Sequence, residues 1–143
     1  MRYFLTCFAL LSVIALTAQR TPEQLGMAPS DIPEGLEVGT TAPDFQGFTD
    51  GGETVTLNGM LEDGAVALIF YRGFWCGKCS HYLSVYQDSL QYLREMGFQL
   101  VAITPESADG VGKTRAKNDL SFTIVSDKGG DIMRAYDVDF RVT

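Results

Sequence analysis

The sequence predicts an α/β fold, in which buried strands alternate with helices. Two apolar runs without charged residues, at 65–71 and 98–104, are typical of strands buried on both faces. The segment between them repeats apolar residues every three or four positions, which is the period of an amphipathic helix. Because the alternation continues to residue 136, we expect parallel strands joined by right-handed helical crossovers.

The first 18 residues have the pattern of a secretory signal peptide. Met1 and Arg2 form a short basic segment, the stretch from Phe4 to Leu16 is nearly all apolar, and small residues lead to an expected cleavage after Ala18. An uncleaved anchor is the alternative, although the apolar stretch is short for a permanent span. We therefore expect export to the periplasm or the outside of the cell, without stable membrane insertion once the signal is removed.

The segments between the signal and residue 64 predict a linker and a β-hairpin. Residues 19–37 are rich in Pro, Gly, Thr and acidic residues and have no sustained period, as in a linker. Two short alternating runs, 45–48 and 53–57, flank the turn signal Asp50-Gly51-Gly52, and this arrangement favours a hairpin.

The elements after residue 64 follow one another with short connections. We expect a strand at 65–71, a helix from Ser80 that stops at Gly97, and a strand at 98–104 that ends before Pro105. A partly helical polar segment follows at 106–118 and a short strand at 122–125. A short helix at 128–136 and the beginning of a strand at 138–142 complete the pattern.

The total length and charge limit the possible functions. A chain of 143 residues with 45% hydrophobic residues suits a single core. Its formal net charge is −7, and no run of Lys or Arg is present. We therefore exclude nucleic acid as a partner, because its phosphate backbone would repel the chain.

Cys76 and Cys79 lie one helical turn apart, directly after the first buried strand. Open α/β sheets place their sites at this end of a strand. The N-terminus of the following helix favours the thiolate of the first cysteine, so we predict that Cys76 is the nucleophile and Cys79 the resolving cysteine. Lys78 adds positive charge nearby. A purely structural disulfide is the alternative, but a bridge over two intervening residues constrains the unfolded chain weakly.

A metal site is a further alternative for the same segment. Cys76, Cys79 and His81 carry ligands that suit Zn²⁺ or Cu⁺, as in a metallochaperone-like module. A structural zinc site normally needs four ligands, and no other Cys or His follows the signal. We expect no metal and no cofactor.

Four passages carry a likeness to a known family: 38–45 (VGTTAPDF), 70–76 (FYRGFWC), 100–105 (LVAITP) and, more weakly, 122–138. The chain resembles the thioredoxin superfamily and, within it, the peroxiredoxin-like AhpC/TSA family of alkyl hydroperoxide reductases and thiol-specific antioxidants. For residues 38–143 the likeness implies a thioredoxin-like fold, in which helices flank a central mixed β-sheet. It also implies an exposed reactive cysteine at Cys76 and a second cysteine at Cys79.

The resemblance implies a thiol-dependent antioxidant oxidoreductase. Its redox-active disulfide would reduce peroxides or protein disulfides, and a thioredoxin-like reductant would reset it. Arg72 is a candidate to stabilise the thiolate, with a solvated surface role as its alternative. Trp75, with Phe74, is a candidate to shield the thiolate or to form a docking surface, and partial core packing is its alternative.

Three departures from the family pattern are visible. Gly77 and Lys78 stand between the cysteines, where related members often have a proline and an aromatic residue. Typical peroxiredoxins have a Thr or Ser three residues before the peroxidatic cysteine, and here Gly73 stands in that position. This replacement favours disulfide exchange as the reaction, whereas the likeness in the other passages favours peroxide reduction. Thioredoxin-like folds normally continue through a cis-proline, a final β-hairpin and a last helix. This sequence stops at Thr143, so we expect these elements to be missing. A catalytically silent fragment therefore remains an alternative.

Overall fold

A computed structural model describes residues 33–139, and Glu34–Asp139 form one compact unit. The expected signal peptide and most of the expected linker lie outside the described residues. Within 33–139, no helix is both long enough and apolar enough to cross a membrane.

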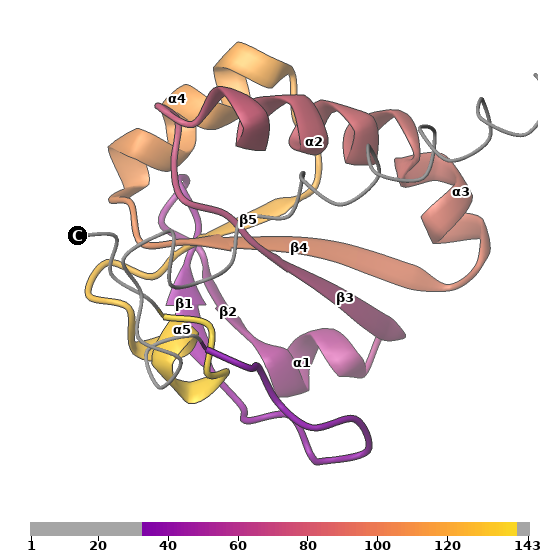
Figure 1. Ribbon diagram of the computed structural model, residues 1–143. Coiled ribbons are helices and arrows are strands. Elements are labelled where there is room, and N and C mark those ends of the chain that lie inside the picture. The colour runs from indigo at the N-terminus through magenta and orange to yellow at the C-terminus, as the bar shows by residue number, and fades with distance from the viewer. Residues whose placement is uncertain (1–32, 140–143) are drawn as a thin grey trace, which may run out of the picture. The chain divides into compact units, whose positions relative to one another are not determined.

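A mixed five-stranded sheet forms the centre of this unit (Figure 1). Its strand order is β2-β1-β5-β4-β3. The strands are β1 (Gln46–Phe48), β2 (Thr54–Thr56), β3 (Ala65–Phe70), β4 (Phe98–Thr104) and β5 (Thr123–Ser126). The last three are parallel, and β1 is antiparallel to both β2 and β5. The predicted hairpin and the predicted parallel crossovers are therefore both confirmed.

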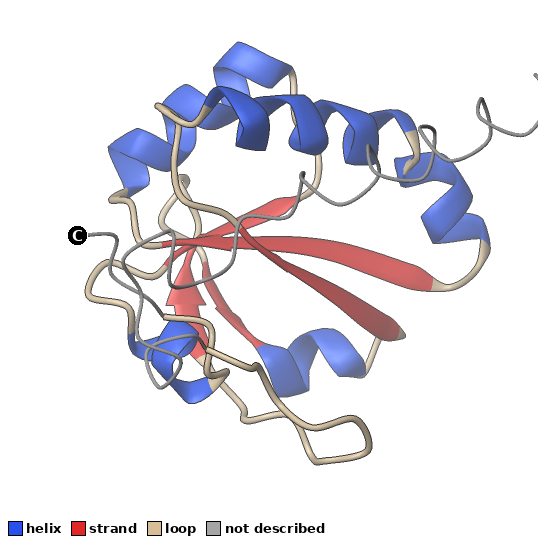
Figure 2. Cartoon of the chain, viewed as in Figure 1, coloured by secondary structure: helices blue, strands red, loops and turns tan. Residues whose placement is uncertain are grey.

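Helices cover both faces of the sheet (Figure 2). They are α1 (Leu57–Leu61), α2 (Gly77–Asp88), α3 (Leu90–Glu95), α4 (Ala108–Asn118) and α5 (Asp131–Ala135). One core cluster lies between the sheet and α2, α3 and α4, and a second lies between the sheet and α1 and α5. Residues 33–139 therefore form three layers, with two hydrophobic cores separated by one sheet.

Strand β4 supplies both cores by simple alternation. Leu100 and Ala102 face the first core, and Val101 and Ile103 face the second. These four residues are at most 7% exposed. The prediction of a strand buried on both faces is confirmed for β4, because it pairs with β3 on one side and β5 on the other.

Strand β3 differs from this prediction. It forms where expected, but Ala65 is exposed and the rest of the strand is only half-buried. Among the described residues β3 pairs with β4 alone, so it lies at an edge of the sheet. Alternate residues of β3 pack against the two cores, so the expectation of burial on both faces is met only in part. An apolar run does not reveal whether a strand has one neighbour or two.

The first helix was not expected from the sequence. Residue 57 begins α1 instead of extending a strand, because the Thr56 side chain accepts a hydrogen bond from Gly59 N at 3.1 Å and caps the helix. Asp44 supports the same turn, since its Oδ1 accepts from Asn58 N at 3.0 Å. A helix of five residues is too short for its period to be recognised in a sequence.

The single helix expected from Ser80 to Gly97 is divided in two. It begins earlier, at Gly77, because Cys76 caps it, and it is interrupted at Ser89. The Ser89 hydroxyl donates to Val85 O at 3.0 Å, a back-bond that is known to bend helices. The predicted stop is confirmed: Gly97 has φ +80 and donates its N–H to Arg94 O at 3.0 Å.

The C-terminal elements are close to prediction. Strand β5 lies one residue later than expected, and α4 accounts for the polar segment. Helix α5 is shorter than the expected 128–136, because Gly129 and Gly130 take positive φ angles before it. The strand expected at 138–142 is not present at 138–139, and its remainder lies outside the described residues.

Candidate active site

The loop from Tyr71 to Cys76 joins the end of β3 to the start of α2. Tyr71 N donates to Ile103 O at 3.0 Å, which ties the loop to the neighbouring strand β4. A tight turn follows, in which Cys76 N donates to Gly73 O at 3.1 Å. These two bonds deliver Cys76 to the N-cap position of α2.

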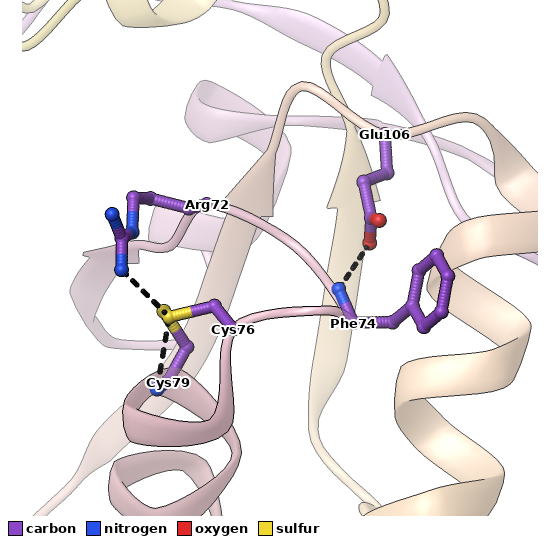
Figure 3. The surroundings of a disulfide bond; sticks show 5 residues. All are labelled: Arg72, Phe74, Cys76, Cys79 and Glu106. Atoms are coloured by element: carbon purple, nitrogen blue, oxygen red, sulfur yellow. Dashed lines mark hydrogen bonds between the residues drawn. A yellow bond between two sulfur atoms is a disulfide. The ribbon is translucent and has the colours of Figure 1, made fainter. Parts of the chain in front are cut away.

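Cys76 and Cys79 form a disulfide across the first turn of α2 (Figure 3). Their Cα atoms lie 5.2 Å apart, within the range that a disulfide requires. Cys79 also packs against the core beneath α2, α3 and α4. The two thiols that the sequence singled out are therefore close enough to be oxidised and reduced as a pair.

Two N–H groups point at the sulfur of Cys76 (Figure 3). The backbone N–H of Cys79 lies 3.2 Å from Sγ, and Nη2 of Arg72 lies 3.3 Å from it. A helix N-terminus and a guanidinium are both groups that stabilise negative charge, and both are directed at this sulfur.

The aromatic residues before Cys76 face solvent instead of the core. Trp75 is 62% exposed, and the Arg72 guanidinium carbon lies 5.1 Å from its ring centroid. Phe74 is 41% exposed, and Lys113 Nζ lies 5.7 Å from its ring centroid. The pKa of Lys113 is raised, chiefly by its hydrogen bond to Asp109 at 2.7 Å, and the lysine therefore stays charged over the ring.

Cys76 itself is only 3% exposed in this oxidised state, whereas the family likeness implied an exposed reactive cysteine. The sulfur is covered because Cys76 caps α2 and Arg72 lies against it. A cleft of about 240 Å³ between β3 and α2 nevertheless reaches both cysteines. Lys78, which is exposed on the first turn of α2, lines the same cleft together with Tyr82 and Tyr86.

Glu106 belongs to the site although sequence analysis did not single it out. It follows β4, and its Oε2 accepts a hydrogen bond from Phe74 N at 2.9 Å (Figure 3). One signal was available: parallel neighbouring strands end at the same edge of the sheet, so the first polar residue after β4 falls beside the loop after β3.

The absence of a hydroxyl at position 73 has a structural cause. Gly73 has φ +149, in the region that favours glycine, and a Cβ there would lie 2.6 Å from Glu106 Oε1. It would also lie 2.8 Å from Trp75 Nε1. In this loop conformation a Thr or Ser at position 73 would be strained by the positive φ, and the side chains of Glu106 and Trp75 would have to move aside.

The geometry does not favour the metal-binding alternative. Residues 33–139 contain no group of three His, Cys, Asp or Glu side chains placed to hold a metal ion. Cys76 and Cys79 are bonded to each other, and the exposed His81 ring lies 5.7 Å from the Tyr82 ring.

Comparison with known protein families matches residues 38–142 to the AhpC/TSA family. The chain belongs to this family. Two curated relatives illustrate its range. Peroxiredoxin Bcp of Bacillus subtilis is 28% identical over 103 residues, which cover 72% of this chain and 65% of that protein. Thiol-disulfide oxidoreductase ResA of Bacillus thuringiensis is 30% identical over 106 residues, which cover 73% of this chain and 60% of that protein. This AhpC/TSA chain thus spans 60–65% of the length of these relatives.

Solved structures confirm the predicted thioredoxin-like fold. Peroxidoxin BcpB of Mycobacterium tuberculosis superimposes with a TM-score of 0.66 at 22% identity, over 68% of this chain and 64% of that chain. Peroxiredoxin Q of Xanthomonas campestris gives a TM-score of 0.62 at 21% identity, over 66% and 59%. The fold, a mixed sheet flanked by helices, is therefore consistent with the assignment of the chain to the AhpC/TSA family.

Proposed function

We propose that this AhpC/TSA chain is a thiol-dependent oxidoreductase in which Cys76 is the nucleophile and Cys79 the resolving cysteine. The observation that carries the proposal is the Cys76–Cys79 disulfide at the start of α2, with two N–H donors directed at Cys76 Sγ. Arg72 stabilises the thiolate, and the exposed Trp75 and Lys78 contribute to substrate docking.

Disulfide exchange is the reaction that the site supports best, because position 73 is a glycine and supplies no hydroxyl to orient a peroxide. The Cys76 thiolate attacks one sulfur of a protein disulfide and expels the other as a thiolate, which takes up a proton. Cys79, as its thiolate, then attacks Sγ of Cys76 and releases the second partner sulfur. The substrate disulfide gains two electrons, and Cys76 and Cys79 lose two.

Peroxide reduction is the second candidate, and the AhpC/TSA match together with the relationship to peroxiredoxin Bcp favours it. The Cys76 thiolate attacks a peroxide oxygen, the O–O bond breaks, and the leaving oxygen takes up a proton. The resulting sulfenic acid condenses with the Cys79 thiol and releases water. In both reactions a thioredoxin-like dithiol returns the pair to the reduced state by exchange.

The domain and localisation proposals rest on the sequence. Residues 1–18 direct export, residues 19–37 link the signal to the domain, and residues 38–143 form the thioredoxin-like domain. The basic start, the apolar stretch and the small residues before position 19 support this assignment. The mass of the protein recovered from an exporting cell tests it: loss of residues 1–18 is expected, and an intact N-terminus on the exported protein contradicts it.

The function is tested by following the two cysteines of the purified, reduced protein. We expect rapid oxidation by a protein disulfide such as that of insulin and slower oxidation by hydrogen peroxide. Cys76→Ser should abolish both reactions, and Cys79→Ser should trap a mixed disulfide with the substrate. Turnover that survives Cys76→Ser contradicts the assignment of the nucleophile. Peroxide consumption that is faster than disulfide exchange reverses the order of the two candidates.

A further inference from the structure

Glu106 occupies a closely fitted position beside the redox loop. On one side lies Gly73, where a Cβ would approach Oε1 to 2.6 Å, and on the other lies Gly110, where a Cβ would approach the Glu106 Cβ to 2.9 Å. Two glycines, one from the loop and one from α4, thus leave the space that this side chain fills. Glu106 is half-buried in this space, between the loop and α4.

The backbone of Glu106 is fixed as well. Ser126 Oγ, at the end of β5, donates to Glu106 O at 2.5 Å. Directly after Glu106, Val111 N donates to Ser107 O at 3.0 Å in the first turn of α4. The carboxylate is therefore presented to the loop from the rigid ends of β4, β5 and α4.

The carboxylate holds the loop at one point, the N–H of Phe74 (Figure 3). Hydrogen bonds to a charged acceptor are stronger than those between neutral groups. Phe74 lies midway between Arg72 and Cys76, so fixing its N–H restricts the path of the backbone that carries both. The Arg72 contact with Cys76 Sγ, at 3.3 Å, spans this restricted segment.

We propose that Glu106 is a positioning residue of the redox site, which holds Phe74 so that the guanidinium of Arg72 reaches the sulfur of Cys76. The inference rests on the proposed thiol function and adds a role for a residue on the neighbouring strand. The carboxylate acts through the loop backbone and has no contact with the disulfide. Its negative charge disfavours the thiolate, whereas its hydrogen bond favours it by keeping Arg72 in place.

Two substitutions separate the hydrogen bond from the charge. Glu106→Gln keeps an oxygen acceptor of the same length and removes the charge. Glu106→Asp keeps the charge, but its shorter side chain withdraws the acceptor from Phe74 N. Glu62→Gln and Glu62→Asp are matched controls, because Glu62 is exposed and precedes β3 at the end opposite the loop.

The measurement is the rate at which Cys76 of the reduced, full-length protein is alkylated as a function of pH, with the Cys76 peptide quantified by mass spectrometry. Glu106→Asp is expected to raise the pKa of the Cys76 thiol by up to about one unit, which is up to about tenfold less thiolate at a fixed pH below that pKa. Glu106→Gln is expected to leave this pKa unchanged or to lower it. Both Glu62 variants should match the wild type.

The proposal is overturned if Glu106→Asp leaves the thiol pKa at the wild-type value, or if Glu106→Gln raises it. Both variants are conservative changes at a half-buried position, and circular dichroism verifies that they are folded. Because alkylation requires no substrate turnover, the result stands even if the protein reduces neither disulfides nor peroxides. Failure of the proposed function and failure of this inference are thus distinguishable.

Discussion

At the scale of single residues, Arg115 joins three parts of the chain. Its Nε and Nη2 donate to the two carboxylate oxygens of Asp50 at 2.8 and 2.9 Å. Its Nη1 donates to Leu120 O at 2.9 Å and to Phe122 O at 3.0 Å. One half-buried side chain on α4 therefore connects the turn of the β1–β2 hairpin to the segment that leads into β5.

This ion pair makes stability depend on pH. The hydrogen bond from Arg115 lowers the pKa of Asp50 from its ordinary 3.8. A carboxyl group with a lowered pKa stabilises the fold above its ordinary pKa, and this contribution is lost as the pH falls through the lowered value. We expect Asp50→Asn to cost about 1–3 kcal/mol at neutral pH and progressively less below pH 3.8.

Urea unfolding at neutral and acidic pH measures this difference, with Asp63→Asn, an exposed carboxylate before β3, as the control. A cost that is equal at both pH values would show that the Asp50 charge contributes nothing.

Two buried tyrosines provide a second prediction at this scale. Tyr136 Oη donates to Pro43 O at 2.7 Å, whereas Tyr71 Oη is buried beside the hydroxyls of Thr104 and Thr114, without a hydrogen bond of good geometry to either. We expect Tyr136→Phe to lower the free energy of unfolding by about 1 kcal/mol and Tyr71→Phe to change it by less than about 0.5 kcal/mol. Denaturant titration of both variants checks this, and equal losses would refute it.

The sequence identified only the part of the candidate site that is contiguous. Arg72, Trp75, Cys76, Lys78 and Cys79 lie within eight positions, so the strand-to-helix junction alone brings them together. Glu106 comes from the next strand, and its contact with Phe74 depends on the pairing register of β3 and β4. The contact of the Arg72 guanidinium with Cys76 Sγ depends on the rotamer of the arginine, which cannot be predicted from the residue pattern.

At the scale of elements, long apolar runs were sufficient to predict strands. The positions where short helices begin and end depend on single local contacts. The run at 98–104 coincides with β4, and its alternation fills both cores. Helix α1 depends on one threonine cap, and the division between α2 and α3 occurs at one serine. Sequence periodicity cannot show either effect, because each involves a single hydrogen bond.

Helix α4 contains two glycines that we expect to respond in opposite ways to alanine. An added Cβ at Gly112 meets nothing within 4 Å, so Gly112→Ala should stabilise the protein by about 0.5–1 kcal/mol through helix propensity. At Gly110 the added Cβ would lie 2.9 Å from the Glu106 Cβ, so Gly110→Ala should destabilise it. Thermal unfolding of both variants tests the pair, and a shift of the same sign in both would contradict the packing described.

At the scale of the whole described unit, stability is expected to be greatest in the middle of the sheet. Strand β4 has a partner on each side and joins the two cores, whereas β2 and β3 lie at the edges of the sheet formed by residues 33–139. Backbone groups at an edge have no partner strand on their outer side. Edge strands therefore open more readily than central strands.

Amide hydrogen exchange measures this gradient. We expect the slowest exchange in β4 and the adjoining β5, and faster exchange in β2 and at the amides of β3 that do not donate to β4. Protection of those outer β3 amides equal to that of β4 would mean that another strand pairs with β3 in solution.

The fit of Glu106 between Gly73 and Gly110 has a consequence for protein engineering. A designer who wishes to convert this site into an efficient peroxidase would first try to install a threonine at position 73, beside Cys76. That single exchange meets both a backbone angle of φ +149 and the carboxylate of Glu106. Because Glu106 also lies against Gly110, we expect a threonine at position 73 to need compensating changes at position 106 and in the backbone of the loop.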